Sequence, residues 1–181
     1  ALYRRAMLAD IGLFDEDFHS YLEDVDLAWR AQLAGWRALY APAARVNHVH
    51  SASLGEASPL KSYLLGRNKL WTLVKNYPDP YLGQRWPLIV AYDLLAAAYA
   101  VLAQGRWGAL AGRLAAWQGM ARAWRKRREV QSRRRADPAE VDRWLEPVEA
   151  PWRVAKRFGH LRAGRSKRSR ATDLTDLVGP H

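Results

Sequence analysis

Apolar residues recur at helical spacing along most of this chain, and short segments with glycine, proline or small polar residues separate the helical stretches. Gly12 and Gly35 stand where the first two stretches end, and Pro78 follows the third, so each has a stop signal. The pattern predicts helices over residues 4–10, 25–34, 60–76 and 137–145.

Extended structure is predicted in two short stretches. Residues 36–40 have the composition of a short strand that Pro42 ends, and residues 45–49 form a second extended piece. Residues 51–59 are small and polar, which indicates a mobile loop.

The second half begins with an apolar run over residues 86–104 that contains Asp93 near its middle. A bilayer-spanning helix needs about 20 apolar residues, and a central charge is costly. We therefore expect a buried or membrane-surface helix rather than a spanning one. From residue 106 onward, one helical face is apolar and arginine and lysine supply the rest; the apolar face comprises Trp107, Leu110, Leu114, Trp117, Ala121 and Trp124.

The net charge indicates what kind of partner the second half of the chain binds. The 181 residues carry a net charge of +11, yet residues 1–105 hold 10 basic and 10 acidic side chains, so the whole excess lies in residues 106–181. Tryptophan on one helical face with arginine on the other is typical of membrane-surface helices, and we expect an anionic membrane surface as partner. Packing of the tryptophans on the first domain is one alternative. Nucleic acid is the least favoured one, because no recognition motif is present.

Six carboxylates between residues 15 and 26 stand among aromatic and aliphatic side chains. Such carboxylates are costly unless they are hydrogen-bonded, bound to metal or working as acid and base. This region is therefore the first candidate for an active site; its carboxylates are Asp15, Glu16, Asp17, Glu23, Asp24 and Asp26. The chain has no cysteine, which excludes disulfides, thiolate nucleophiles and cysteine-ligated zinc.

Several spaced motifs carry a family resemblance. They are Gly12-Leu13-Phe14-Asp15-Glu16, Glu23-Asp24-Val25-Asp26-Leu27, Ala34-Gly35-Trp36 and Pro42-x-Ala44-x-Val46-x-His48. Together they resemble the acceptor-side half of a family 2 glycosyltransferase, closest to the rhamnosyltransferase-like members, over about residues 1–77. The resemblance implies an α/β fold for this part, an incomplete GT-A type, Rossmann-like half. The pattern and charge of the second half predict that a mainly helical, basic, membrane-associating region follows it.

The residue pattern predicts a domain plan for the second half, and the resemblance implies the role of the first half and a reaction. Residues 1–80 would be the acceptor side of the catalytic domain, 81–135 a membrane-surface region, and 136–181 a short helix with a basic, partly disordered tail. The chain would be a fragment, inactive alone, that lacks the donor-binding half. The full enzyme would transfer a single sugar with inversion from a nucleotide-sugar donor to a lipid-linked or cell-envelope glycan, at the cytoplasmic face of the membrane, with Mn²⁺ or Mg²⁺. The alternative is a non-enzymatic basic domain that binds membrane or nucleic acid.

The resemblance also assigns roles to residues. Asp24 corresponds to the general base that deprotonates the acceptor hydroxyl; the alternative is a helix N-cap. Glu23 would orient Asp24 or bind the acceptor sugar. We favour Asp26 as a first-turn acid that interacts with the helix dipole.

Substrate binding is assigned to Asp15, Glu16, Trp36 and Arg67. A structural role is favoured for Asp15, and Glu16 stays open. Arg67 and its neighbour Asn68 fall inside an apolar helix, where a buried pair that satisfies backbone or carboxylate partners is the favoured alternative.

A divalent metal ion is expected to bind His48, which follows the Pro-x-Ala-x-Val-x pattern; an ordinary loop histidine is the alternative. His50 is a weaker candidate for the same role. Residues 51–55 would be either a loop that orders over the donor diphosphate or a plain surface connector.

Overall fold

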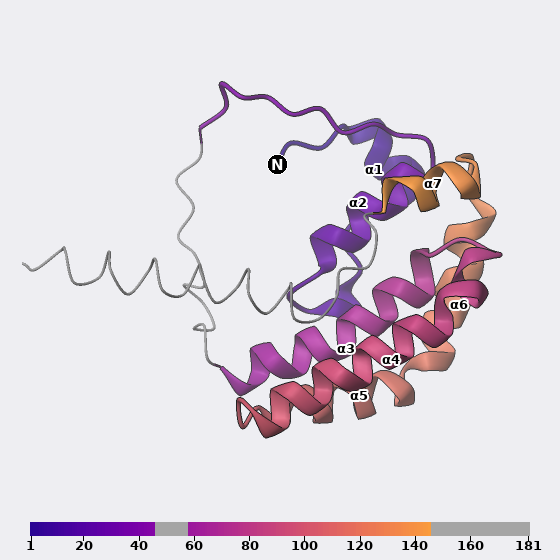
Figure 1. Cartoon of the computed structure of the whole chain (residues 1–181). Helices are drawn as coiled ribbons and strands as arrows, with labels where there is room; N and C mark the ends of the chain where they lie inside the picture. Colours follow the sequence, from indigo (N-terminus) through magenta and orange to yellow (C-terminus); the bar gives the residue numbers. More distant parts are fainter. Residues whose placement is uncertain (46–57, 146–181) are drawn as a thin grey trace, which may run out of the picture. The chain divides into compact units, whose positions relative to one another are not determined.

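The structure, a computed structural model, describes residues 1–45 and 58–145. These residues belong to one compact unit and fold into helices (Figure 1). The helices are α1 (Arg5–Ile11), the 3₁₀ helix η1 (Glu16–Phe18), α2 (Glu23–Leu33), α3 (Pro59–Asn76), α4 (Tyr81–Leu102), α5 (Trp107–Gln118), α6 (Met120–Ser132) and α7 (Pro138–Trp144).

The predicted α/β fold of GT-A type is wrong for this part of the chain, because the described residues contain no β-strand. Residues 36–40, predicted as a strand, are irregular, and the side chains of Leu39 and Tyr40 are 94% and 90% exposed. A strand needs a neighbouring strand to pair its backbone groups, and none of the described segments supplies one. Of the second extended piece, residues 46–49 lie outside the described ranges.

The predicted helices are confirmed in α1, α2, α3 and α7, with small shifts at their ends. Asp137 begins α7 by accepting hydrogen bonds from the backbone N–H groups of Ala139 and Glu140, and Pro138 fits the first helical position. Helix α2 begins at Glu23, two residues earlier than expected. Its N-cap position is therefore occupied by Leu22, and Asp24 lies inside the first turn.

The long helix α3 lies at the centre of the unit and packs on α2, α5 and α6 (Figure 1). One buried cluster joins η1 to α3, α5 and α6, and consists of Phe18, Leu70, Trp71, Val74, Ala116 and Ala123. A second cluster joins α1 to α2 and consists of Met7, Ile11, Leu27, Ala31 and Ala34. Residues 12–24, here called the acidic loop, carry five of the six carboxylates of residues 15–26 and run from the end of α1 to the start of α2, between the two clusters.

Helices α3 and α5 approach each other closely enough to require glycine. A Cβ atom on Gly112 would overlap the carbonyl oxygen of Tyr63, and one on Gly66 would lie 2.6 Å from the carbonyl oxygen of Ala109. The buried positions of α5 are likewise small, namely Ala109, Gly112 and Ala116. Small residues on both helices thus let the two backbones pack directly against each other.

Candidate functional site

The acidic loop has an unusual backbone immediately before α2. His19, Tyr21 and Leu22 all have positive φ angles, of 62°, 66° and 68°. Left-handed backbone costs about 1–2 kcal/mol for each residue with a Cβ atom, so three such residues persist only where the surroundings hold them. Glu23 and Asp24 follow directly, which makes the position of this pair depend on a strained turn.

Asn68 and Arg67, both on α3, hold this turn through its carbonyl groups. The amide nitrogen of Asn68 donates to the carbonyl oxygens of Phe18, Ser20 and Tyr21 at 2.8–2.9 Å. Arg67 Nη2 donates to the carbonyl oxygens of Asp17 and Phe18 at 2.8 and 3.1 Å. These contacts favour the structural alternative that the sequence left open for the pair, and Asn68 is completely buried.

The same guanidinium group also stacks on aromatic rings of its own helix. The Arg67 Cζ atom lies 4.6 Å from the centroid of the Trp71 ring and 5.7 Å from that of Tyr63. Such stacking fixes the plane of the guanidinium group. The proposed role of Arg67 in substrate binding stays a prediction.

Three of the six carboxylates are neutralised by lysine and arginine. Asp26 is fully buried; it accepts a hydrogen bond from Arg30 Nε at 2.9 Å and lies 2.8 Å from Lys75 Nζ. Asp15 lies 2.5 Å from the ammonium groups of both Lys75 and Lys126. Asp17 lies 2.6 Å from the ammonium group of Lys126.

Asp26 is therefore more than a first-turn acid. It is in the first turn of α2, as expected, but its side chain is at the centre of a buried network that also includes the amide of Asn76, which donates to Asp26 Oδ1 at 2.9 Å. Buried ions are tolerated when they are paired and hydrogen-bonded. This network joins α2 to α3.

The ion pairs also set the acidity of the acidic loop. Burial raises the pKa of Asp15, but hydrogen bonds from Lys126 and Lys75 outweigh it and lower this pKa to about 2. Burial likewise raises the pKa of Asp17, and the hydrogen bond from Lys126 again outweighs it, so that the pKa is lowered. Carboxylates stabilised in this way stay ionised at neutral pH and accept a proton poorly. This argues for a structural role of Asp15, which the sequence favoured.

The other three carboxylates, Glu16, Glu23 and Asp24, have no ion pair with any of the described residues. Asp24 is exposed, and its Oδ1 atom accepts one hydrogen bond, from the backbone N–H of Val25 at 2.8 Å. Glu23 is half-buried, and its Oε2 atom is shielded from solvent without a hydrogen-bond partner among the described residues. A shielded, unpaired carboxylate oxygen is costly.

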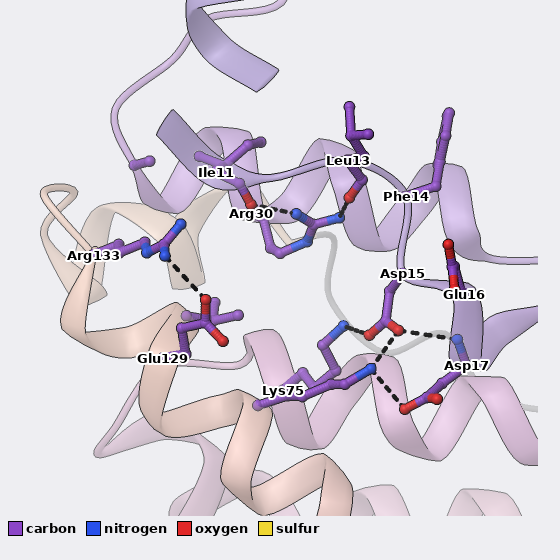
Figure 2. Close-up of a pocket in the computed structure, with 13 residues that line it drawn as sticks. Ile11, Leu13, Phe14, Asp15, Glu16, Asp17, Arg30, Lys75, Glu129 and Arg133 are labelled. Atoms are coloured by element: carbon purple, nitrogen blue, oxygen red, sulfur yellow. Dashed lines mark hydrogen bonds and ion pairs between the residues drawn. The ribbon is translucent and has the colours of Figure 1, made fainter. Parts of the chain in front are cut away.

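A cavity of about 390 Å³ opens beside the acidic loop. Figure 2 shows Arg30 on its wall, donating to the carbonyl oxygens of Ile11 and Leu13 at 2.6 and 2.7 Å. Leu13 and Phe14 are exposed apolar residues of this lining. The full lining is Ile11, Leu13, Phe14, Asp15, Glu16, Asp17, Arg30, Ala34, Lys75, Lys126, Glu129, Val130 and Arg133. Apolar walls with charged groups of both signs suit a ligand with many hydroxyl groups.

The remaining predicted site residues are placed as follows. Trp36 does not line this cavity; its indole N–H donates to Asp10 Oδ2 at 2.8 Å. His48, His50 and the loop of residues 51–55 lie outside the described ranges. Within those ranges, no group of three histidine, aspartate or glutamate residues could hold a metal ion. The substrate-binding role of Trp36 and the metal-binding role of His48 stay predictions.

Sequence reasoning missed the lysines that organise the loop. Lys75 is only 3% exposed, although it lies in a helix with an amphipathic pattern. Its position, seven residues after Asn68 and four after Trp71, puts it on the inward face of α3. This spacing in the sequence could have indicated that Lys75 faces the interior.

Comparisons with known proteins found relatives of parts of the chain. One is the N-acetylglucosaminyl-diphospho-decaprenol L-rhamnosyltransferase of Mycobacterium tuberculosis, which is 42% identical over 64 residues, or 34% of this chain and 21% of the relative. Another is the pre-mycofactocin glycosyltransferase of the same organism, which is 36% identical over 94 residues, or 52% of this chain and 18% of the relative.

These matches cover about a fifth of each relative's length. No family model matches the chain, and no solved structure matches it significantly. The partial similarities relate the matched part of the chain to glycosyltransferases and to no finer class.

Proposed function

We propose that this chain supplies the acceptor side of an inverting glycosyltransferase of family 2, which transfers a single sugar from a nucleotide-sugar donor. The general class is supported by the partial similarity to two glycosyltransferases. The inverting course and the nucleotide-sugar donor rest on the motif resemblance. A lipid-linked or cell-envelope glycan acceptor is supported by the name of the first relative, which contains a diphospho-decaprenol group.

The observation that carries the proposal is the contrast among the carboxylates. Asp15, Asp17 and Asp26 are tied to lysine and arginine, whereas Asp24 is exposed and has no ion pair among the described residues. An acceptor hydroxyl can reach an exposed carboxylate, and a carboxylate without a cationic partner is the better proton acceptor. The strained turn that precedes Glu23 fixes where this carboxylate is presented.

Asp24 would act as the general base. The acceptor hydroxyl oxygen forms a bond to the anomeric carbon of the donor sugar, the bond from that carbon to the diphosphate oxygen breaks, and the hydroxyl proton passes to an Asp24 carboxylate oxygen. The nucleoside diphosphate leaves with the bonding electron pair, so charge and atoms balance.

Glu23 and the cavity would hold the acceptor. Glu23, directly before Asp24 in α2, would orient Asp24 or hydrogen-bond a second acceptor hydroxyl. The cavity beside η1 would hold a more distant part of the acceptor, with Phe14 as an apolar platform and Glu16 as a hydrogen-bond acceptor.

A divalent metal ion, Mn²⁺ or Mg²⁺, belongs to the proposal through His48 alone. The described residues do not form a site for it, and no step above is routed through the metal. If bound, it would hold the donor diphosphate and stabilise charge on the leaving group.

The test compares sugar transfer by the full-length gene product with that of two variants, over a panel of nucleotide sugars. Asp24→Asn should lower kcat about 10²-fold or more, the size expected for loss of a general base. Asp137→Asn is the matched control, because asparagine also caps a helix well, and it should leave kcat unchanged. Equal rates for Asp24→Asn and wild type would refute the base assignment. No turnover by wild type with any donor would favour the alternative of a non-enzymatic binding domain.

A further inference from the structure

Helix α5 exposes its large apolar side chains and buries its small ones. Trp107, Leu110, Leu114 and Trp117 are 67%, 38%, 60% and 58% exposed, at helical spacing along one face. The opposite face, which packs on α3, is built from alanine and glycine. A surface helix of a soluble domain usually shows the reverse arrangement.

Helix α4, which packs beside α5, also exposes large apolar side chains. Its exposed apolar residues include Leu95, Tyr99 and Leu102, which share one helical face, and Leu94. Its buried residues are Leu82, Asp93 and Ala97. The end of α4 and the start of α5 follow each other closely, so the two faces combine in one apolar surface, which comprises Leu94, Leu95, Tyr99, Leu102, Trp107, Leu110, Leu114 and Trp117.

Basic side chains adjoin this surface on α6, which follows α5 directly after Gly119. Arg125 and Arg128 are exposed, and so is Trp124, at 46%. Arg122 is exposed as well, but it is ion-paired with Asp17 at 3.1 Å. No acidic side chain precedes Glu129 on α5 or α6. An exposed apolar surface of this extent marks an interaction site. The neighbouring arginines indicate that its partner is negatively charged.

We propose that the apolar surface of α4 and α5 docks on an anionic lipid bilayer, with the arginines of α6 at the phosphate groups. Tryptophan and tyrosine are suited to the headgroup region, since their rings are apolar and their N–H and O–H groups are polar. Each arginine near an anionic surface adds to the attraction. The docking does not depend on the proposed transfer activity.

A charged cluster in the middle of α4 argues that the helix lies on the bilayer surface and does not cross it. By length and composition α4 could span a membrane. However, Asp93 is ion-paired with Lys69 of α3 and with Arg113 of α5, whose Nε and Nη2 atoms donate to it at 2.7 and 2.9 Å. A spanning α4 would carry these three charges to the bilayer centre, where each is costly.

The test measures sedimentation of the full chain with vesicles of phosphatidylcholine alone and vesicles that also contain phosphatidylglycerol. Wild type should bind the anionic vesicles more tightly. Trp107→Ser/Trp117→Ser should weaken this binding at least about tenfold, because roughly half of each indole would otherwise be buried in lipid. The matched control is Leu39→Ser/Tyr40→Ser, which removes two apolar residues elsewhere that are more exposed than the tryptophans and should bind like wild type.

Charge variants give a second test that does not affect the packing. Arg125→Gln/Arg128→Gln should weaken binding to anionic vesicles about 30-fold, which corresponds to about 2 kcal/mol for two arginines. Arg37→Gln/Arg45→Gln, which removes two exposed arginines outside the helices, is the control. Alkaline carbonate should release wild type from the vesicles, as it does any protein bound at the surface.

Four outcomes would overturn the proposal. Equal binding of wild type to neutral and anionic vesicles would contradict the charge argument, and unchanged binding of both surface variants would contradict the assigned surface. A dimer of the wild-type chain that Trp107→Ser/Trp117→Ser converts to a monomer, without vesicle binding, would show that a second copy covers this face. Retention after carbonate would show a spanning α4.

Discussion

Lys75 provides the sharpest test of how the site is held together, through the substitution Lys75→Met. Methionine retains the length and apolar stem of the side chain but removes its charge. In the wild type this charge lies 2.5 Å from Asp15 and 2.8 Å from Asp26, whose side chains are 8% and 0% exposed. It also lies 4.9 Å from the centroid of the Phe18 ring.

The expected cost follows from what remains after the substitution. Removing one partner of a buried ion pair costs about 3–5 kcal/mol, because it leaves a buried charge without compensation. Asp15 keeps Lys126, and Asp26 keeps Arg30, so the lower end applies, about 3 kcal/mol. For a chain of this size, that lowers the melting temperature by about 6–12 °C.

The assay is urea unfolding followed by circular dichroism, with Lys126→Met as the matched control. Lys126 shares the partner Asp15, but its side chain is 31% exposed, so its loss should cost about 1 kcal/mol or less. The cost of Lys75→Met should also shrink toward about pH 3, since Lys75 helps to lower the pKa of Asp15 from 3.8 to about 2 and this contribution to stability is lost as the pH falls through that range. A Lys75→Met variant no less stable than Lys126→Met, or one whose cost is equal at both pH values, would refute the buried-pair argument.

Three further outcomes are expected from unfolding experiments. The wild-type free energy of unfolding should fall as the pH drops from 3.8 to about 2, because the lowered pKa of Asp15 stabilises the folded chain only while this carboxyl is ionised. Asp15→Asn should reduce this pH dependence, and an unchanged pH dependence would contradict the role of Asp15. Gly112→Ala should cost about 1–3 kcal/mol or more through overlap with the Tyr63 backbone, whereas Gly83→Ala, which meets nothing within 4 Å, should stabilise slightly. Asn68→Ala should cost about 1–3 kcal/mol because it leaves turn carbonyls unpaired, and a cost near zero would show that the strained turn holds itself.

Local signals in the sequence were enough to locate helices. The glycines and prolines that end α1, α2 and α3, and the Asp137-Pro138 pair that begins α7, act within a few residues, so they can be read without the fold. The prediction of a strand over residues 36–40 was wrong because a strand depends on a partner elsewhere in the fold. Its β-type composition describes a surface that needs a partner, and the described residues contain no strand to pair with.

The candidate site could be located in the sequence, but the sequence did not show which of its carboxylates are ion-paired. Six carboxylates in twelve positions mark a region, yet their roles depend on which cations face them. Lys75 is 60 residues from Asp15 and Lys126 is 111 residues away. Spacing rules act over a few residues, so they could not predict that Asp15 and Asp17 are neutralised while Asp24 is not.

The tryptophan pattern shows the same limit on the other half of the chain. Its period predicted a helix with an apolar face, but period does not tell which face is buried. The close packing of Gly66 and Gly112 decides the matter, because only small residues allow α3 and α5 to approach this closely. The large side chains are then left on the outside.

The direct succession of α5 and α6 at Gly119 has a geometric consequence. Lys126, which holds Asp15 and Asp17, comes seven residues after Gly119, a rise of about 10 Å along α6. If α5 and the exposed arginines of α6 lie on a bilayer, Lys126, on the same helix as those arginines, keeps the acidic loop close to the headgroups. An acceptor carried on a lipid would then meet the loop near the membrane surface, so acceptors with the reactive sugar close to the lipid would be favoured.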